Sequence, residues 1–238
     1  MTIVYIFLTA VLSATAQSVT GFGYGVVSMA ALPLVMSPVS AVAISGLIGN
    51  VQSVYLSLKS RRHINFRIML IPLISSVISA WITIRIVVRQ PDELMKKVLG
   101  VFLIGMALYL LFLNNRIKIR ANVKTGLISG IVSGVANGLF GMGGPVTVMY
   151  MMAATKDKEE YLSTTQCLFL LSGIFTTIAR LFSGVFTVQV WKYSALSILG
   201  MLIGLVLGNY IFKKITQKQL NFFVYGFMMC MGLIIIVT

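Results

Sequence analysis

Acidic residues are scarce in this chain of 238 residues, which holds five aspartates and glutamates against nineteen lysines and arginines. The acids fall in expected loops or at the ends of apolar runs, at Asp92, Glu93, Asp157, Glu159 and Glu160. Because no carboxylate lies inside an apolar run, none is placed to relay protons within a membrane or to bind sodium or an organic cation there. The shortage of acids therefore disfavours a cation as substrate and favours an anion.

Reactive and metal-binding side chains are equally few. The two cysteines, Cys167 and Cys230, lie in apolar runs without the spacing of a metal site, so we expect them to be packing residues. The single histidine, His63, sits in a basic stretch and is expected at the surface rather than in catalysis. No serine–histidine–aspartate or metal-ligand pattern is present, so the sequence predicts no enzyme, no metal and no cofactor.

Charged residues make up only 10% of the chain, whereas hydrophobic residues make up 58%, with a mean hydropathy of +0.97. A soluble domain carries about 25% charged residues. Apolar runs near or above ~20 residues, the length that crosses a bilayer core of ~30 Å, recur along the whole chain. The ~10-residue alternating segments of a transmembrane β-barrel are absent. The first run, 3–16, resembles a signal-peptide core but lacks a basic flank, so we expect it in the mature protein.

The sequence thus predicts an all-α polytopic membrane protein. Its apolar segments fall into two sets of five with similar lengths, 2–20, 22–36, 39–58, 66–88 and 94–113, then 123–140, 142–154, 161–182, 190–212 and 220–237. Placing Gly21 on Gly141 and Gly23 on Gly143 also places Val26 on Val146. We therefore expect an internal repeat, with a first repeat at 1–115 and a second at 116–238 that together form one transport domain.

The net charge of +14 suggests nucleic acid at first, but basic residues also gather in the cytoplasmic loops of membrane proteins, so no nucleic-acid partner is expected. The loop 183–189 is nearly neutral, whereas its counterpart 59–63 is strongly basic. The two repeats are therefore expected to be inverted. Each would be a glycine-broken helical hairpin, re-entrant or fully crossing, plus three transmembrane helices, with both termini on the non-cytoplasmic side. A single broken span in place of the hairpin would give parallel repeats, which the charges disfavour.

Two glycine-rich stretches, 17–25 and 137–145, lie at matching positions of the two repeats. A glycine costs about 1 kcal/mol per helical site relative to alanine, so both stretches are expected to break a helix. Such breaks occur at membrane depth only where the freed backbone is buried in protein or lines a watery cavity. In transporters with inverted repeats, half-helix N-termini meet near the midplane and point at an anion.

Close packing of membrane helices is the alternative explanation for such glycines. Two motifs at equivalent positions, each preceded by a polar residue (Gln17 and Asn137), favour an anion site over packing alone. Neutral donors for the same site are expected from Ser18, Asn50, Gln52, Thr164, Thr165 and Gln166.

Arg85 and Arg180 interrupt apolar helices near their expected non-cytoplasmic ends. Two explanations remain open for them: the side chains snorkel to the membrane interface, or they attract the anionic substrate.

The stretch 17–25 followed by Leu32-Pro33-Leu34, the stretch 137–145 and the basic segment 61–67 together resemble the TauE/SafE sulfite-exporter family over the whole chain. The resemblance implies a transporter of the bacterial or archaeal cytoplasmic membrane that moves sulfite, sulfonates or related small organic anions. Matched position by position, it implies substrate-binding roles for Gln17, Thr20, Gly21, Phe22, Gly23, Gly25, Asn137, Gly138, Gly141, Gly143, Gly144 and Pro145.

The expected function is anion transport by alternating access, with the anion held at half-helix N-termini between the repeats. A passive anion channel and a non-transporting scaffold subunit are the alternatives. The expected partners are a small anionic substrate and the lipid bilayer, and a homodimer is left open. The chain departs from the family pattern at Tyr24, which replaces a glycine of many relatives, so the resemblance implies a class of substrate rather than one anion.

Overall fold

Helices make up nearly all of the computed structural model, which describes residues 1–20, 23–59, 63–113, 120–211 and 217–237 and contains no strand within them. The described part of the first half forms α1 (Thr2–Thr20), α2 (Gly23–Ala31), α3 (Pro38–Lys59), α4 (Phe66–Val87) and α5 (Asp92–Leu108). That of the second half forms α6 (Val123–Phe140), α7 (Gly144–Ala154), α8 (Lys158–Phe182), α9 (Val188–Ile211) and α10 (Gln217–Val237). A 3-10 turn, η1 (Leu32–Leu34), follows α2, and a π-helical turn, η3 (Tyr109–Leu113), ends α5.

Polar residues fix where several of these helices begin. The side chain of Asn122 accepts a hydrogen bond from the backbone N–H of Thr125 at 2.9 Å, and the Thr125 hydroxyl accepts one from the Asn122 backbone at 3.0 Å. This reciprocal pair is a capping box for α6. At the start of α8, the Asp157 carboxylate accepts from the backbone N–H groups of Glu159 and Glu160 at 2.9 and 2.8 Å. The few polar residues of the loops therefore mark the helix boundaries.

The all-α polytopic membrane fold is confirmed, and the helices match the expected apolar segments closely. By length and composition, α4, α5, α6, α8 and α9 can each cross a membrane. In contrast, α2 and α7 have 9 and 11 residues. At 1.5 Å per residue these reach about 14 and 17 Å, roughly half of a ~30 Å hydrocarbon core. Each glycine-rich stretch is therefore followed by a half-length helix.

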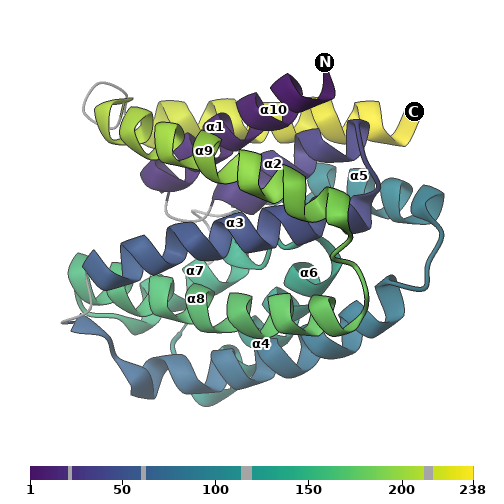
Figure 1. Cartoon of the computed structure of the whole chain (residues 1–238). Coiled ribbons are helices and arrows are strands. Elements are labelled where there is room, and N and C mark those ends of the chain that lie inside the picture. Colours follow the sequence, from purple (N-terminus) through teal and green to yellow (C-terminus); the bar gives the residue numbers. More distant parts are fainter. Residues whose placement is uncertain (21–22, 60–62, 114–119, 212–216, 238) are drawn as a thin grey trace.

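The two halves exchange their fourth helices. α4 packs along α6 and α8 of the second half, and α9 packs along α1 and α3 of the first half. The result is a first bundle of α1, α2, α3 and α9 and a second bundle of α4, α6, α7 and α8, while α5 and α10 pack on each other. Figure 1 shows α9 beside α1 and α4 below α6 to α8. The main contacts of one bundle recur in the other, so that α1·α9 corresponds to α6·α4 and α3·α9 to α8·α4.

Stripes of glycine explain why these helix pairs approach so closely. Along α6, Gly130, Gly134 and Gly138 face α4, and a Cβ added at Gly138 would lie 2.7 Å from the Cβ of Thr83. Along α9, three glycines four residues apart face α1, and a Cβ added at Gly200 would lie 2.8 Å from the carbonyl oxygen of Phe7. Small residues at a spacing of four let membrane helices come into backbone contact. For these stripes, close packing is the correct explanation of the glycines.

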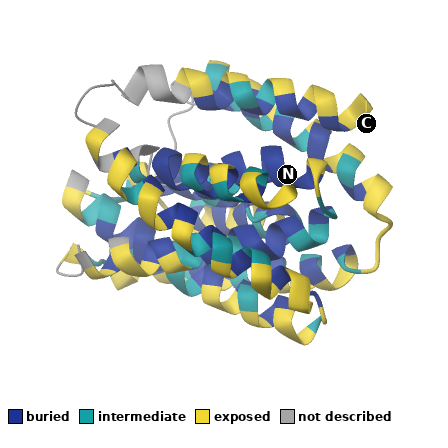
Figure 2. Ribbon diagram, turned by 45° about the horizontal axis from the view of Figure 1, so that its top comes forward, coloured by how far each residue is buried: buried dark blue, intermediate teal, exposed yellow. Residues whose placement is uncertain are grey.

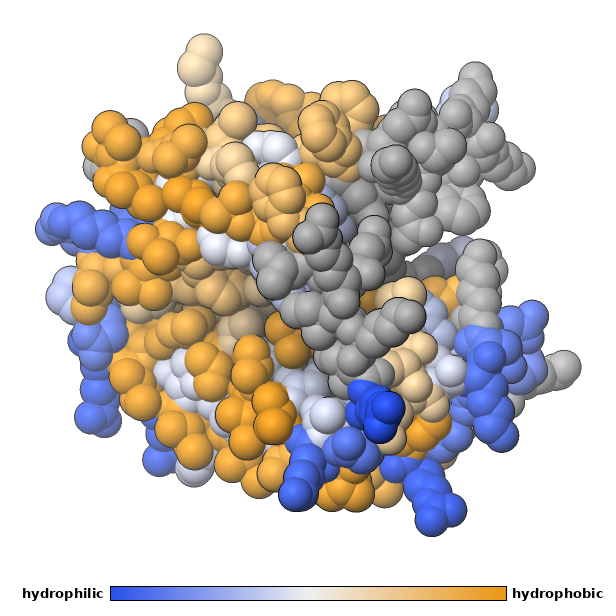
Figure 3. Space-filling model, turned by 180° about the vertical axis from the view of Figure 1, so that it is seen from behind, coloured by the Kyte–Doolittle hydropathy of each residue, from blue (hydrophilic) through white to orange (hydrophobic). Residues whose placement is uncertain are grey.

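Large hydrophobic side chains cover much of the outside of the molecule. Leu12, Ile74, Ile78, Leu199 and Val206 are all more than half exposed. Figure 2 shows buried residues on the inner faces of the helices and exposed ones outside, and Figure 3 shows a broadly hydrophobic surface with hydrophilic residues mainly at its margins. An outer surface of this kind is suited to lipid rather than to water.

The rarer side chains divide between core and surface. Cys167 is buried in a small cluster with Tyr150 and Met151 of α7 and Leu73 of α4, as expected of a packing residue. Cys230 is exposed on α10, so the packing role expected for it is wrong within this chain. His63 is a surface residue, as expected, and its Nε2 lies 3.5 Å from a carboxylate oxygen of Glu159.

Candidate substrate site

The two glycine-rich breaks meet at the interface of the bundles. A Cβ added at Gly25, in the first turn of α2, would overlap the carbonyl oxygen of Gly141 in the second break. Gly141 ends α6 in the left-handed region at a φ of 68°, and its N–H donates to the carbonyl oxygen of Asn137 at 2.8 Å. Glycine adopts that conformation without the steric penalty of a side chain. A side chain is therefore excluded at Gly25 by close approach of the Gly141 backbone and disfavoured at Gly141 by its left-handed conformation.

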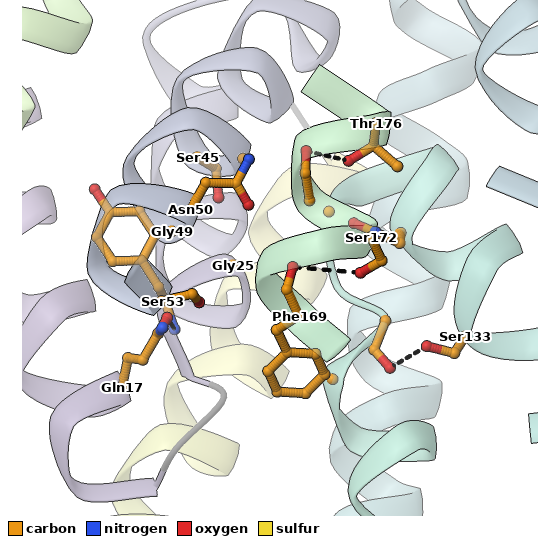
Figure 4. Close-up of a pocket in the computed structure, with 17 residues that line it drawn as sticks. Gln17, Gly25, Ser45, Gly49, Asn50, Ser53, Ser133, Phe169, Ser172 and Thr176 are labelled. Atoms are coloured by element: carbon orange, nitrogen blue, oxygen red, sulfur yellow. Dashed lines mark hydrogen bonds between the residues drawn. The ribbon is translucent and has the colours of Figure 1, made fainter. Parts of the chain in front are cut away.

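A cavity of about 80 Å³ lies where the breaks meet. Its walls come from both glycine-rich stretches and from the middle of α3, α6 and α8 (Figure 4). Six of the expected site residues line it, namely Gln17, Gly25, Asn137, Gly141, Gly143 and Gly144. The other lining residues are Tyr24, Ser45, Gly46, Gly49, Asn50, Ser53, Ser133, Phe169, Ser172, Gly173 and Thr176.

The remaining expected site residues have other positions. Gly138 faces Thr83 of α4 rather than the cavity, and Pro145 sits in the first turn of α7, where its missing N–H is harmless. Gly23 begins α2 without lining the cavity. Gly21, Phe22 and the side chain of Thr20 lie outside the described residues.

Serine and threonine side chains fix the second break. The Ser133 hydroxyl donates to the carbonyl oxygen of Gly143 at 2.6 Å and lies 2.6 Å from the Thr147 hydroxyl. The Ser129 hydroxyl donates to the carbonyl oxygen of Val146 at 3.2 Å. These bonds engage the carbonyl groups at the start of α7, and helix geometry leaves the first N–H groups of α7 without partners inside the helix. Those N–H groups are therefore available to a ligand.

A different set of bonds fixes the first break. The side-chain oxygen of Gln17, which is 5% exposed, accepts a hydrogen bond from the backbone N–H of Tyr24 at 3.2 Å. The hydroxyls of Ser28 on α2 and Ser45 on α3 lie 2.5 Å apart and join these helices. In the first repeat, the protein itself thus occupies one of the N–H groups at the start of the half-length helix.

The centres of α3 and α8 form the facing walls of the cavity. The Asn50 amide on α3 donates to the Thr177 hydroxyl on α8 at 2.8 Å, which links the two bundles directly. Of the neutral donors expected from the sequence, only Asn50 lines the cavity. Gln52 instead donates to the carbonyl oxygen of Ala14 at 3.1 Å, and the Thr164 hydroxyl accepts from the backbone of Asn65 at 3.0 Å.

Apart from Asn50, sequence reasoning missed the polar residues that α3 and α8 contribute to the cavity. Ser45, Gly49 and Ser53 recur every four residues, and Ser172 and Thr176 repeat the same spacing on α8. A spacing of four places side chains on one face of a helix. A search for polar faces on apolar helices would therefore have found them.

The two arginines have different environments, and neither lines this cavity. Arg85 is exposed, with its guanidinium 3.9 Å from the centre of the Trp81 ring, as suits a side chain at a membrane interface. Arg180 is only 3% exposed, so the snorkelling explanation is wrong for it. Its Nη2 donates to the carbonyl oxygens of Asn137 at 2.7 Å and Gly138 at 3.4 Å. It thus places a cation at the negative end of the α6 dipole.

Uncharged hydrogen-bonding groups dominate the cavity, since its lining includes amides, hydroxyls and glycine backbone but no carboxylate, lysine or arginine. Among the described residues, the ion pairs are confined to His63 with Glu159 and Lys97 with Glu93, outside the cavity. The fold and the site together define a multi-pass α-helical membrane protein with a small cavity, lined by uncharged residues, between two helical bundles.

The comparison with known families agrees with this class. The family model for the sulfite exporter TauE/SafE matches residues 6–235, nearly the whole chain, and the protein belongs to this family of membrane transporters. No curated protein and no solved structure gave a match.

Proposed function

We propose that the protein carries a small oxyanion, sulfite or a compact sulfonate, across the membrane by alternating access, with the anion bound in the cavity between the breaks. The observation that carries the proposal is the meeting of both glycine-rich stretches at one polar cavity. Helix N-termini favour anions because their free N–H groups and their dipole present positive charge. The hydroxyl and amide groups of Ser53, Asn50 and Asn137 on the cavity walls add neutral donors.

Arg180 supports an anionic substrate although it does not touch the cavity. Its Nη1 would lie 3.2 Å from a Cβ added at Gly46, a residue that lines the cavity. Among the described residues, no carboxylate forms an ion pair with this buried guanidinium. Coulomb interactions are stronger away from water. An anion in the cavity therefore gains from the nearby positive charge, whereas a cation is repelled.

The matched contacts of the two bundles support two inverted repeats, 1–115 and 116–238. Both termini lie at the same end of the molecule, which fits an arrangement with both on the non-cytoplasmic side (Figure 1). The exchange of α4 and α9 indicates which parts of the molecule move as bodies. The bodies that rock are the first and second bundles rather than the two halves of the chain, because each fourth helix is packed into the opposite bundle.

Paired cysteines test this motion in a background without Cys167 and Cys230. Asn50→Cys with Thr177→Cys joins the two bundles, since the native side chains are 2.8 Å apart. The matched control, Asn65→Cys with Glu160→Cys, joins groups 2.7 Å apart inside the second bundle. Because Asn50 also lines the cavity, each pair is compared with its own unbridged state. A short, reducible thiol cross-linker should lower transport below that level only in the first pair, and reduction should return it to that level. Transport that continues while the first pair is bridged would overturn the proposed motion.

Counterflow in proteoliposomes tests the transport itself. Vesicles loaded with unlabelled sulfite should transiently accumulate radiolabelled sulfite above its external concentration, because a carrier exchanges one anion for another. A passive channel gives flux without this uphill phase, and a scaffold subunit gives no flux. Either result would overturn the proposal.

A further inference from the structure

Two aromatic side chains stand out among the small residues that line the cavity. Tyr24 comes from α2 and Phe169 from α8, whereas most of the remaining lining residues are glycine, serine, threonine or asparagine. Tyr24 is 2% exposed, so its ring is enclosed by protein on nearly all sides. These two rings are the bulkiest side chains on the cavity wall.

The internal repeat gives Tyr24 a direct counterpart. The alignment that places Gly23 on Gly143 places Tyr24 on Gly144, and both residues line the same cavity. The second break thus has no side chain at the position where the first break carries the phenol ring of Tyr24. The chain itself shows that the backbone of such a break does not require a side chain there.

The Tyr24 ring is buried beside α3. A Cβ added at Gly49 would lie 3.9 Å from the Cδ1 atom of the ring, so the ring lies close to the backbone of α3. The backbone N–H of Tyr24 is bound to the Gln17 side chain at 3.2 Å, which fixes the residue at the start of α2. Protein interiors are close-packed, so a ring that is 2% exposed yields to a ligand only at a cost.

The cavity volume indicates how large a bound anion can be. One water-sized group occupies roughly 10–15 Å³, so a cavity of about 80 Å³ holds about five to eight such groups. Sulfite, with one sulfur and three oxygen atoms, fits within this space, and so does methanesulfonate with one more carbon. Benzenesulfonate, in which a six-membered ring is attached to the sulfonate, has more non-hydrogen atoms than this number of groups and is expected to exceed the space.

We propose that Tyr24 sets the upper size limit of the transported anion and thereby restricts the protein to compact oxyanions. This inference rests on the proposed function of the cavity as an anion site. The ring acts by occupying volume, so its hydroxyl is not required for the limit. Tyr24 is in this sense a specificity-determining residue.

Binding of a graded series of anions tests the proposal. Isothermal titration of the purified full chain would use sulfite, methanesulfonate and benzenesulfonate as ligands. The wild type should bind the first two and not the third. Tyr24→Ala should gain benzenesulfonate binding by about tenfold or more, the scale that pocket shape commonly gives. Tyr24→Phe should keep the wild-type limit, because it retains the ring.

Tyr150→Ala is the matched control, since Tyr150 is also buried, at 5% exposure, and lies on α7 without lining the cavity. This variant should lose stability without gaining the larger anion. If Tyr24→Ala binds small anions but its size limit stays that of the wild type, the role of Tyr24 is refuted while the anion site stands. If the wild type binds no anion of the series, both the proposed function and the size limit fall.

Discussion

Gly25→Ala probes the contact on which the candidate site depends. The added Cβ would overlap the carbonyl oxygen of Gly141 and would lie 3.6 Å from Cγ of Met142. Because the obstacle is backbone rather than a flexible side chain, α2 or the second break must shift. Overpacking of this kind costs about 1–3 kcal/mol. For a chain of this size each 1 kcal/mol lowers the melting temperature by roughly 2–4 °C, so a fall of about 2–12 °C is expected.

The assay pairs thermal unfolding of the purified protein with sulfite counterflow in proteoliposomes. Gly25→Ala should lower both the melting temperature and the transport rate, since it separates the two breaks. Gly105→Ala is the control, because a Cβ added at Gly105 on α5 meets nothing within 4 Å. That control should keep transport and hold or raise stability, as alanine favours helix by about 1 kcal/mol. Wild-type stability and transport in Gly25→Ala would refute the contact between the breaks.

Three further predictions separate the roles of individual side chains. Asn137→Ala should weaken sulfite binding by about tenfold or more in a titration, because a hydrogen bond to a charged group contributes about 1.5–3 kcal/mol. Gln17→Ala should weaken it less, since the Gln17 side-chain oxygen is bound to the N–H of Tyr24. Equal effects of the two substitutions would contradict the role of Asn137 as a donor to the anion. Arg180→Gln should lower both sulfite affinity and melting temperature, whereas Arg85→Gln should change neither, and an unaltered affinity in Arg180→Gln would remove its electrostatic role. Ser133→Ala should lower the free energy of unfolding by about 1 kcal/mol, measured by thermal melts, through loss of its bond to Gly143.

Much of the fold could be predicted from the sequence because the apolar segments are long and their ends are polar. Asn122 and Asp157 cap helices where the apolar runs begin, so most boundaries agree within a few residues. The exchange of α4 and α9 was not predictable in this way. The glycines spaced by four on α6 and α9 indicate that each helix packs closely on another, but the spacing does not identify the partner.

The residues of the candidate site could likewise be predicted only in part from the sequence. Gln17, Asn137 and the motif glycines were found because they interrupt apolar runs at matching positions. Ser45 and Thr176 were missed because they lie in unbroken helices, where only the polar faces that they share with Ser53 and Ser172, respectively, indicate a role. Arg180 was recognised as unusual, but its bond to the end of α6 depends on the packing of α8 against the second break.

The two breaks lie at equivalent positions in the sequence but contribute differently to the proposed anion site. Gln17 is one methylene longer than its counterpart Asn137, and its side-chain oxygen reaches the N–H of Tyr24. In the second break, Ser133 binds the carbonyl oxygen of Gly143 instead, and the N-cap residue of α7, Gly143, provides no side-chain hydrogen bond to the first N–H groups of the helix. The buried charge of Arg180 also lies beside Asn137. Donors and positive charge are therefore concentrated on the second break, while the first contributes the Tyr24 ring, so under the proposed function we expect the second repeat to bind the anion and the first to limit its size.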